Sequence, residues 1–206
     1  MNPVIAALIS ILPAYFLGSV NGAIITSKIF FRKDIREYGS GNPGLTNFYR
    51  VFGKSGALLV IAIDVIKTIA PMLIAGRIYR DHFDMLLFGK ALAGVSVVFG
   101  HCFPILYKFK GGKGIMAAGT VLFVLDWRIA AFSWGTFIIV LLITRYVSLA
   151  SVLGAAIFPP AMVLLKSGGI NEFIVMTLCS ALLIIRHKEN IQRLLRGQES
   201  KFKFSG

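Results

Sequence analysis

The chain contains apolar stretches that are too long and too free of charge for a water-soluble domain. Residues Val4–Thr26 carry no charged side chain, and Ala91–Tyr107 has a single histidine as its one ionisable basic group. A helix needs about 20 apolar residues to cross the hydrocarbon core of a bilayer. Charged residues make up only 15% of the chain, against roughly 25% in soluble domains. The sequence therefore predicts an all-α, polytopic transmembrane helical bundle.

Seven apolar segments alternate with more polar connections, which predicts one membrane domain over residues 1–206 with about seven spans. The segments are 3–31, 56–79, 84–107, 115–126, 129–144, 147–165 and 171–186. The fourth and fifth are short, and Asp126-Trp127-Arg128 between them is typical of an interfacial turn with an aromatic anchor. They fit either two tilted or partly buried helices or one long broken helix. Pro159-Pro160 should kink the sixth segment and Pro71 the second, because proline removes a hydrogen bond inside a helix.

The basic residues divide unequally between the two sides of such a bundle. Four of the 22 Lys and Arg residues follow spans 2, 4 and 6 and fifteen follow spans 1, 3, 5 and 7. The fifteen are Arg32, Lys33, Arg36, Arg50, Lys54, Lys108, Lys110, Lys113, Arg145, Arg186, Lys188, Arg193, Arg196, Lys201 and Lys203. Because cytoplasmic loops carry the excess of Lys and Arg, we expect the N-terminus outside and the C-terminus in the cytoplasm. In a membrane chain the net charge of +13 indicates orientation and anionic partners, such as membrane lipid, and not nucleic acid.

Two glycine-containing segments on the predicted cytoplasmic side have anion-binding character. In residues 38–50, glycines permit tight turns, short polar side chains supply donors and an arginine supplies charge. The candidate residues there are Ser40, Asn42, Gly44, Thr46, Asn47 and Arg50. The same composition also fits an ordinary flexible loop.

Residues 109–114 form the second glycine segment, which enters an apolar helix where backbone N–H groups and the helix dipole attract anions. Its candidates are Lys110, Gly111, Gly112, Lys113 and Gly114. It is not a Walker A loop, because Gly114 stands where Ser or Thr is required. We expect a positive φ at Gly112 and a loop outside the apolar packing. The two lysines alternatively serve only as anchors beside a span.

Two further segments complete the predicted site. Residues 145–151 contribute Arg145 and Ser148 at the start of the sixth span. In residues 186–199, Arg186, Asn190 and Arg193 share one helix face, with His187 beside them. An amphipathic helix that binds anionic lipid head groups would have the same pattern.

Three ionisable groups lie at membrane depth, where charge is costly. Asp64 and Lys67 are three residues apart on the second span, so they can form an ion pair. That pair is either purely structural or part of a polar site. His101 ends the third span and either orients a loop or supports one of the binding sites. No Cys/His cluster indicates zinc, and the few acidic residues on the predicted cytoplasmic side argue against a metal pair, so we expect neither a metal nor a cofactor.

Four motifs follow one another along the chain: Gly39-Ser40-Gly41-Asn42-Pro43-Gly44-x-Thr46-Asn47, Gly100-His101-x-Phe103-Pro104, Lys110-Gly111-Gly112-Lys113-Gly114 and Arg186-His187-x-x-Asn190-Ile191-x-Arg193-Leu194. Together they resemble the acyl-phosphate-dependent glycerol-3-phosphate acyltransferases of bacterial inner membranes, the PlsY family. The resemblance covers nearly the whole chain. One departure is Ala117, where the family usually has threonine.

The resemblance implies transfer of a fatty acyl group from acyl phosphate to the sn-1 hydroxyl of glycerol-3-phosphate, the first step of bacterial phospholipid synthesis. The products would be lysophosphatidic acid and phosphate. The catalytic candidates are His187, Asn190 and Lys113, and the hydroxyl proton passes to His187 or to a donor phosphate oxygen. The glycine segments would cradle acyl phosphate, and glycerol-3-phosphate would be held by Lys110, Arg145, Ser148, Arg186, His187, Asn190 and Arg193. His101 could support either site, and we expect a monomer.

A small phosphate or organic-anion transporter is the alternative from another class. It would explain the basic loops and the intramembrane Asp64 and Lys67. A transporter typically places polar groups near the midplane on several spans, often within inverted repeats. The polar residues here collect at one mouth of the bundle, which favours an interfacial enzyme.

The predicted topology is tested by single cysteines at Ser40 and Gly197, labelled in sealed cells with a membrane-impermeant reagent. Both positions should resist labelling until the membrane is permeabilised, because both belong to the predicted cytoplasmic side. Labelling of either cysteine in intact cells would contradict the predicted orientation.

Overall fold

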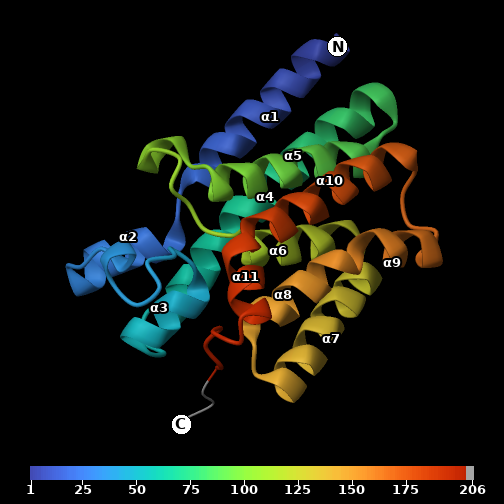
Figure 1. Cartoon of the computed structure of the whole chain (residues 1–206). Helices are drawn as coiled ribbons and strands as arrows, with labels where there is room; N and C mark the ends of the chain where they lie inside the picture. Colours follow the sequence, from blue (N-terminus) through green and yellow to red (C-terminus); the bar gives the residue numbers. More distant parts are fainter. Residues whose placement is uncertain (203–206) are drawn as a thin grey trace.

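The computed structural model describes residues 1–202, and all regular elements in this part of the chain are helical (Figure 1). The α-helices are α1 (Pro3–Ser19), α2 (Gly22–Phe31), α3 (Leu45–Phe52), α4 (Ala57–Phe83), α5 (Leu86–Cys102), α6 (Ile115–Leu125), α7 (Trp127–Thr144), α8 (Val147–Ala156), α9 (Phe158–Leu165), α10 (Ile170–Arg186) and α11 (Lys188–Leu195). Two short 3-10 turns are η1 (Ile35–Glu37) and η2 (Ile105–Tyr107). The all-α class is confirmed. Lys203, counted among the basic residues above, lies outside the described residues.

The described residues contain fewer full spans than the seven expected. Five helical stretches are long and apolar enough to cross a membrane, and α10 with α11, bent by 54°, makes a sixth if counted as one span. The five are Pro3–Phe31, Ala57–Phe83, Leu86–Tyr107, Trp127–Thr144 and Val147–Leu165. The predicted fourth span is the helix α6, which has only 11 residues. At 1.5 Å per residue it covers about 16 Å, roughly half of the hydrocarbon core.

Helix α6 is short because it lies inside the bundle. Most of its side chains are buried, and it contacts α4, α5 and α7. Asp126 separates it from α7 by accepting a hydrogen bond from the backbone N–H of Arg128 at 2.9 Å, as an N-cap residue does. Of the two arrangements that the sequence allowed, two separate helices are present.

Two other predicted segments are interrupted. The sixth breaks between α8 and α9 beside Pro159 and Pro160, which occupy the first turn of α9 as expected. The first breaks at Val20 and Asn21, which the sequence interpretation did not anticipate. There Asn21 Oδ1 accepts a hydrogen bond from Ile24 N at 3.0 Å and starts α2 anew.

Small residues let α1 approach α5 closely. A Cβ atom added to Gly100 would lie 2.2 Å from the backbone oxygen of Tyr15, and one added to Gly18 would lie 2.3 Å from that of Val97. Contacts of this kind are typical of helices that associate within a bilayer, where backbones meet at glycine. The two glycines therefore fix the spacing of α1 and α5.

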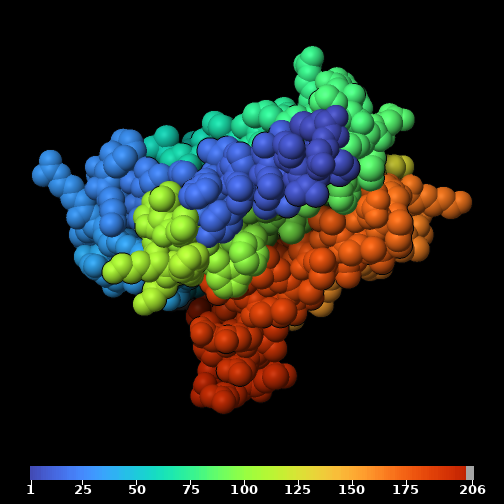
Figure 2. Space-filling view, turned by 90° about the horizontal axis from the view of Figure 1, so that it is seen from above, coloured from blue at the N-terminus to red at the C-terminus, as the bar shows by residue number. Residues whose placement is uncertain are grey.

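The outer helices present large apolar side chains away from the bundle. Leu12 and Phe16 on α1 are exposed, as are Leu142 and Ile143 on α7. Exposed apolar surface on this scale marks contact with lipid or another apolar partner. In contrast, the charged segment around α11 projects from the apolar body (Figure 2). Much of the charge of the chain thus lies beside the apolar helices.

The same substitution at two glycines should have opposite effects on stability. Gly100→Ala should lower the free energy of unfolding in detergent by about 1–3 kcal/mol, because the added methyl group overpacks the α1–α5 contact. Gly135→Ala on α7 is the control, since a Cβ atom there meets nothing within 4 Å. It should raise stability by about 0.5–1 kcal/mol through helix propensity. Equal effects in thermal unfolding would show that α1 and α5 are not in close contact.

Candidate active site

The segments 109–114 and 186–199 meet directly at one end of the bundle. Arg186 Nη2 donates to the backbone oxygens of Gly111 at 3.2 Å and Gly112 at 3.1 Å. The Lys113 ammonium donates to Asn190 Oδ1, which lies 77 positions further along the chain. The predicted helix face of the fourth segment therefore faces the second glycine segment.

The other two predicted segments join the same assembly. The backbone oxygen of Pro43 lies 3.2 Å from the position that a Cβ atom of Gly112 would occupy, so the two glycine segments are in contact. The chain after α11 then crosses back, where Arg50 lies 3.5 Å from Ser200 Oγ and the Phe202 N–H donates to the Arg145 backbone oxygen at 2.7 Å. All four predicted segments are thus brought together.

A hydrogen-bonded cluster of charged and amide side chains forms the centre of the site. Glu199 accepts from Asn190 Nδ2 through Oε1 and from Arg193 Nε through Oε2, both at 2.7 Å. Asn190 in turn accepts from Lys113. Asn190 is buried, and the Glu199 side chain is only 8% exposed. Shared hydrogen bonds among such groups hold their donors in fixed directions.

The charges in this cluster are tuned by burial and by one another. Burial lowers the pKa of Lys113 to about 8, against the opposing attraction of Glu199. For Glu199, burial raises the pKa, but hydrogen bonds from Asn190 and Arg193 and the nearby Ser148 outweigh it and leave the pKa below its usual range. Near neutral pH the carboxylate is ionised and Lys113 is mostly protonated, so the cluster keeps a net positive charge.

His187 is buried where α10 ends. Burial lowers its pKa to about 4, although a hydrogen bond with the Leu183 carbonyl opposes the shift. Nδ1 lies 2.8 Å from that carbonyl oxygen, which can only accept, so Nδ1 carries the proton. The ring is therefore neutral at physiological pH, and Nε2 is left as a proton acceptor.

The segment 109–114 differs from expectation in how its glycines are used. Gly114 has the positive φ, +82°, whereas Gly112 does not, so that prediction was wrong. Gly112 is buried against His101, whose Nε2 lies 2.3 Å from the position of an added Cβ atom. Its N–H donates to the His101 backbone oxygen at 3.1 Å. The loop therefore belongs to the packed interior, and glycine is needed there for packing on the His101 ring.

The segment 38–50 is organised by Asn47. Its side chain is buried, with Oδ1 accepting from Ser40 N at 2.9 Å and Nδ2 donating to the Tyr38 oxygen at 3.0 Å. These hydrogen bonds stabilise the loop, so the Asn47 side chain holds the turn together and is not exposed to solvent. Gly44 caps α3 without a side-chain hydrogen bond. Beside the α3 N-terminus lie the more exposed candidates Ser40, Asn42 and Thr46.

Several predicted residues lie away from the central cluster. His101 is buried behind Gly112, and its side chain contacts Lys67 Nζ at 3.0 Å. Lys110 is exposed at the edge of its loop. Ala117, the departure from the family pattern, is fully buried in the apolar core and so does not replace a hydroxyl at the cluster.

Glu199 and Asn21 were not predicted as site residues. Asn21 Nδ2 donates to the Pro43 oxygen at 3.0 Å and so holds the first glycine segment. The Asn-Gly pair in the middle of an apolar run is a signal for that break, because asparagine favours helix N-caps. Glu199 could have been found as a lone carboxylate after a strongly basic helix.

A narrow apolar pocket lies between α6, α7, α8, α9 and α10. Its lining includes Ile115, two residues after Lys113, and Leu183, whose carbonyl contacts His187. Ser151, which lies one turn after Ser148 on α8, and Trp134 on α7 also line the pocket. The pocket is therefore lined in part by α6 and α10, the two helices that begin and end at the charged cluster.

Comparison with known proteins places this arrangement in a family. The family model described as glycerol-3-phosphate acyltransferase matches residues 8–197. A glycerol-3-phosphate acyltransferase of Dechloromonas aromatica (strain RCB) is 42% identical over 94% of each chain, and one of Shewanella woodyi is 39% identical over 93% of this chain and 91% of its own.

Two solved structures share the fold. They are crystal structures of PlsY (YgiH), an integral membrane glycerol 3-phosphate acyltransferase, in the glycerol 3-phosphate form and the lysophosphatidic acid form. Both superpose with a TM-score of 0.84 over 96% of this chain, and they are 34% and 33% identical to it. The first match covers 96% of its own chain and the second 95%. With four co-linear motifs, a family match over most of its length and this shared fold, the chain belongs to the PlsY family of glycerol-3-phosphate acyltransferases, integral membrane enzymes of phospholipid synthesis.

Proposed function

We propose that the chain uses acyl phosphate as its donor and acylates the sn-1 hydroxyl of glycerol-3-phosphate. The hydroxyl oxygen forms an ester bond with the acyl carbon while the bond from that carbon to the phosphate oxygen breaks. The hydroxyl proton ends on the leaving phosphate, either directly or through Nε2 of His187. The products are lysophosphatidic acid and phosphate, and no oxidant, metal or carrier takes part.

The observation that carries the proposal is that α6 and α10, which begin and end at the charged cluster, also line an apolar pocket. Lys113, Asn190 and Arg193 supply donors suited to a phosphate group, and the lining of the pocket begins two residues after Lys113. A substrate pair with two phosphates and one long acyl chain needs both environments within a few ångströms. A soluble phosphate ester alone would not need the apolar wall.

Glycerol-3-phosphate is assigned to the cluster around Asn190. Arg193 and Arg145 offer guanidinium groups, which suit phosphate oxygens, and Ser148 lies beside Glu199. Lys113 belongs with this group by its contact with Asn190, although the sequence interpretation placed it with the acyl-phosphate loop. Glu199 holds the amide and guanidinium groups in position. Arg186 acts through the backbone of the second glycine segment.

Acyl phosphate is assigned to the first glycine segment. Ser40, Asn42 and Thr46 lie beside the N-terminus of α3, where unpaired backbone N–H groups favour an anion, and Arg50 lies one turn further along. The acyl chain then extends into the apolar space between α6, α7, α8 and α10. The reacting carbonyl would sit between the two glycine segments, which touch at Pro43 and Gly112.

Most of the rate enhancement is ascribed to positioning and charge stabilisation. Acyl phosphate is a mixed anhydride with a good leaving group, so departure needs little acid catalysis. Holding the hydroxyl and the acyl carbon in contact removes an entropic barrier, and fixed donors stabilise the developing oxyanion. His187, neutral with Nε2 as acceptor, is suited to guide the hydroxyl proton.

The site is proposed to face the cytoplasm from a bacterial inner membrane, with the N-terminus outside and the protein acting as a monomer. The asymmetry of basic residues supports this orientation, because fifteen of the 22 lysines and arginines lie on the side of the predicted bundle that carries the site segments. A transporter of phosphate or organic anions is less well supported. Asp64 and Lys67, the buried charged residues of the spans, form an ion pair with each other at 2.7 Å and so need no transported ion as a partner.

The donor is tested by incubating purified protein with glycerol-3-phosphate and either palmitoyl phosphate or palmitoyl-CoA. Lysophosphatidate should form from palmitoyl phosphate and not from the thioester, since the first glycine segment is assigned to a phosphate group. Mass spectrometry identifies the product, and regiochemistry is read from the acylated position. Comparable turnover with palmitoyl-CoA would contradict the proposal, and accumulation of labelled glycerol-3-phosphate in vesicles without acylation would favour a transporter.

Lys113 and Lys188 form a matched pair for testing the cluster. Lys113→Ala should lower kcat/KM for glycerol-3-phosphate about 10- to 150-fold, because a charge-assisted hydrogen bond contributes roughly 1.5–3 kcal/mol. Lys188→Ala removes the same charge from an exposed position on α11 and should change kcat/KM less than about twofold. In the native enzyme, kcat/KM should also fall as the pH rises above about 8, where Lys113 loses its proton. Equal effects of the two substitutions would reduce Lys113 to a membrane anchor.

A further inference from the structure

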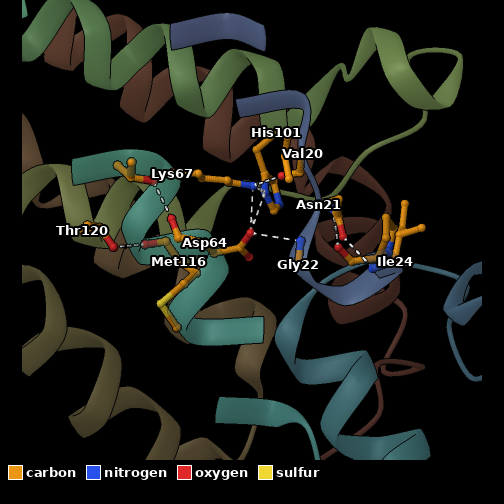
Figure 3. A network of polar contacts seen from close by, with 11 residues as sticks. Val20, Asn21, Gly22, Ile24, Asp64, Lys67, His101, Met116 and Thr120 are labelled. Carbon is orange, nitrogen blue, oxygen red and sulfur yellow. Dashed lines mark hydrogen bonds and ion pairs between the residues drawn. The ribbon is translucent and has the colours of Figure 1, made fainter. Parts of the chain in front are cut away.

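Behind the two glycine segments lies a buried charged group that the proposed chemistry does not use. Asp64 and Lys67 on α4 and His101 at the end of α5 are 2%, 5% and 4% exposed (Figure 3). Lys67 Nζ lies 2.7 Å from Asp64 Oδ1, and His101 Nδ1 lies 3.9 Å from the same oxygen. Charge is costly to bury unless it is paired and hydrogen-bonded, so a feature of this kind calls for a specific role.

The Lys67 ammonium has three N–H groups and three acceptors. Besides Asp64 it contacts the backbone oxygen of Val20 at 2.6 Å and Nδ1 of His101 at 3.0 Å. Because an ammonium only donates, Nδ1 must accept, which places the imidazole proton on Nε2. Lys67 therefore fixes the ring of His101 and the end of α1 at the same time.

One arm of this arrangement leads to the second glycine segment. The His101 backbone oxygen accepts from the Gly112 N–H at 3.1 Å, and the His101 ring fills the space where a Gly112 side chain would be. Gly112 is followed directly by Lys113. A shift of the His101 ring would therefore move the backbone from which Lys113 reaches Asn190.

The other arm leads to the first glycine segment through the helix break. Lys67 donates to the Val20 backbone oxygen, and Asp64 Oδ1 accepts from Gly22 N at 3.3 Å. The two charged side chains therefore bind the residues on either side of Asn21. Asn21 Nδ2 donates to the Pro43 oxygen. Figure 3 shows Asn21 and the Asp64–Lys67–His101 group around the same break.

We propose that Asp64 and Lys67 are positioning residues for the acyl transfer. By holding His101 and the Asn21 break together, they set the spacing of the two glycine segments and so of the two bound substrates. Neither residue touches substrate in this role. The kinetic part of the inference rests on the proposed function, since it assigns glycerol-3-phosphate to the Lys113 side and acyl phosphate to the Pro43 side.

The test removes both charges together, so that no single buried charge is left unpaired. In Asp64→Asn with Lys67→Met, the introduced amide oxygen still accepts from Gly22, while Val20 and His101 lose the ammonium donor. KM should rise roughly tenfold or more for glycerol-3-phosphate and for palmitoyl phosphate, because the contacts that hold both glycine segments in position are lost. Amide hydrogen exchange should become faster in residues 42–45 and 110–114 and stay unchanged in α7. A fall in kcat with both KM values unchanged would indicate a structural role alone and overturn the proposal.

A second variant keeps the proposal testable if the double variant does not fold. Asn21→Ser retains an N-cap for α2 but removes the donor to Pro43. It should raise KM for palmitoyl phosphate and leave KM for glycerol-3-phosphate unchanged, whereas equal changes in both would contradict the two-arm arrangement.

The matched control is Thr68→Val, one residue further along α4. Thr68 is buried, and its hydroxyl donates to the Asp64 backbone oxygen at 2.7 Å. Its KM values should equal those of the native enzyme, and a rise like that of the double variant would assign the effect to general disturbance of α4. Activity of the native enzyme with palmitoyl phosphate is measured first. Its absence would refute the proposed donor, while the hydrogen-exchange comparison would still decide whether Asp64 and Lys67 position the segments.

Discussion

The ammonium of Lys67 is the point from which the polar end of this bundle is organised. Lipid offers no hydrogen bonds to a charge or to free backbone groups, so each must find its partner inside the protein. Lys67 meets this requirement with a carboxylate, a helix-terminal carbonyl and an imidazole. The same contacts end α1, orient His101 and place two loops. The contacts that offset the cost of burying the Lys67 charge thereby also define the geometry of the site.

The site itself follows a division of labour between backbone and side chains. Gly112 and Asn47 are occupied with packing and hydrogen bonds inside the protein, so their segments are rigid supports. The groups proposed to meet glycerol-3-phosphate, such as Lys113 and Arg193, are long and charged. Rigid support beneath long charged side chains gives fixed donor positions, which is what stabilisation of a developing charge requires.

The apolar segments and the distribution of basic residues predicted much of this structure. Contacts between segments that are distant in the sequence could not be predicted from them. Apolar runs predicted the helices, Pro159-Pro160 predicted an irregularity in the sixth segment, and the four glycine- or arginine-containing segments were predicted on one side, where the structure brings them together. The break at Asn21 was missed because it depends on Asp64, over 40 positions away. The φ of Gly112 was wrong because the reason for glycine there is the ring of His101, a contact across two elements. Glu199 was missed as a site residue because its contacts with Asn190 and Arg193 form only where the chain after α11 folds back on that helix.

The order of the contacts along the chain also bears on biosynthesis. Lys113 meets Asn190 from 77 positions away, and Arg50 meets Ser200 from 150. The ribosome must therefore finish residues 186–202 before the cluster can close, even though the helices before them can already be inserted. During translation the early glycine segments can already contact Asn21 and His101, but Lys113 stays without Asn190. If the cluster binds substrate as proposed, the nascent chain cannot act until α11 has docked, and membrane insertion then precedes catalysis.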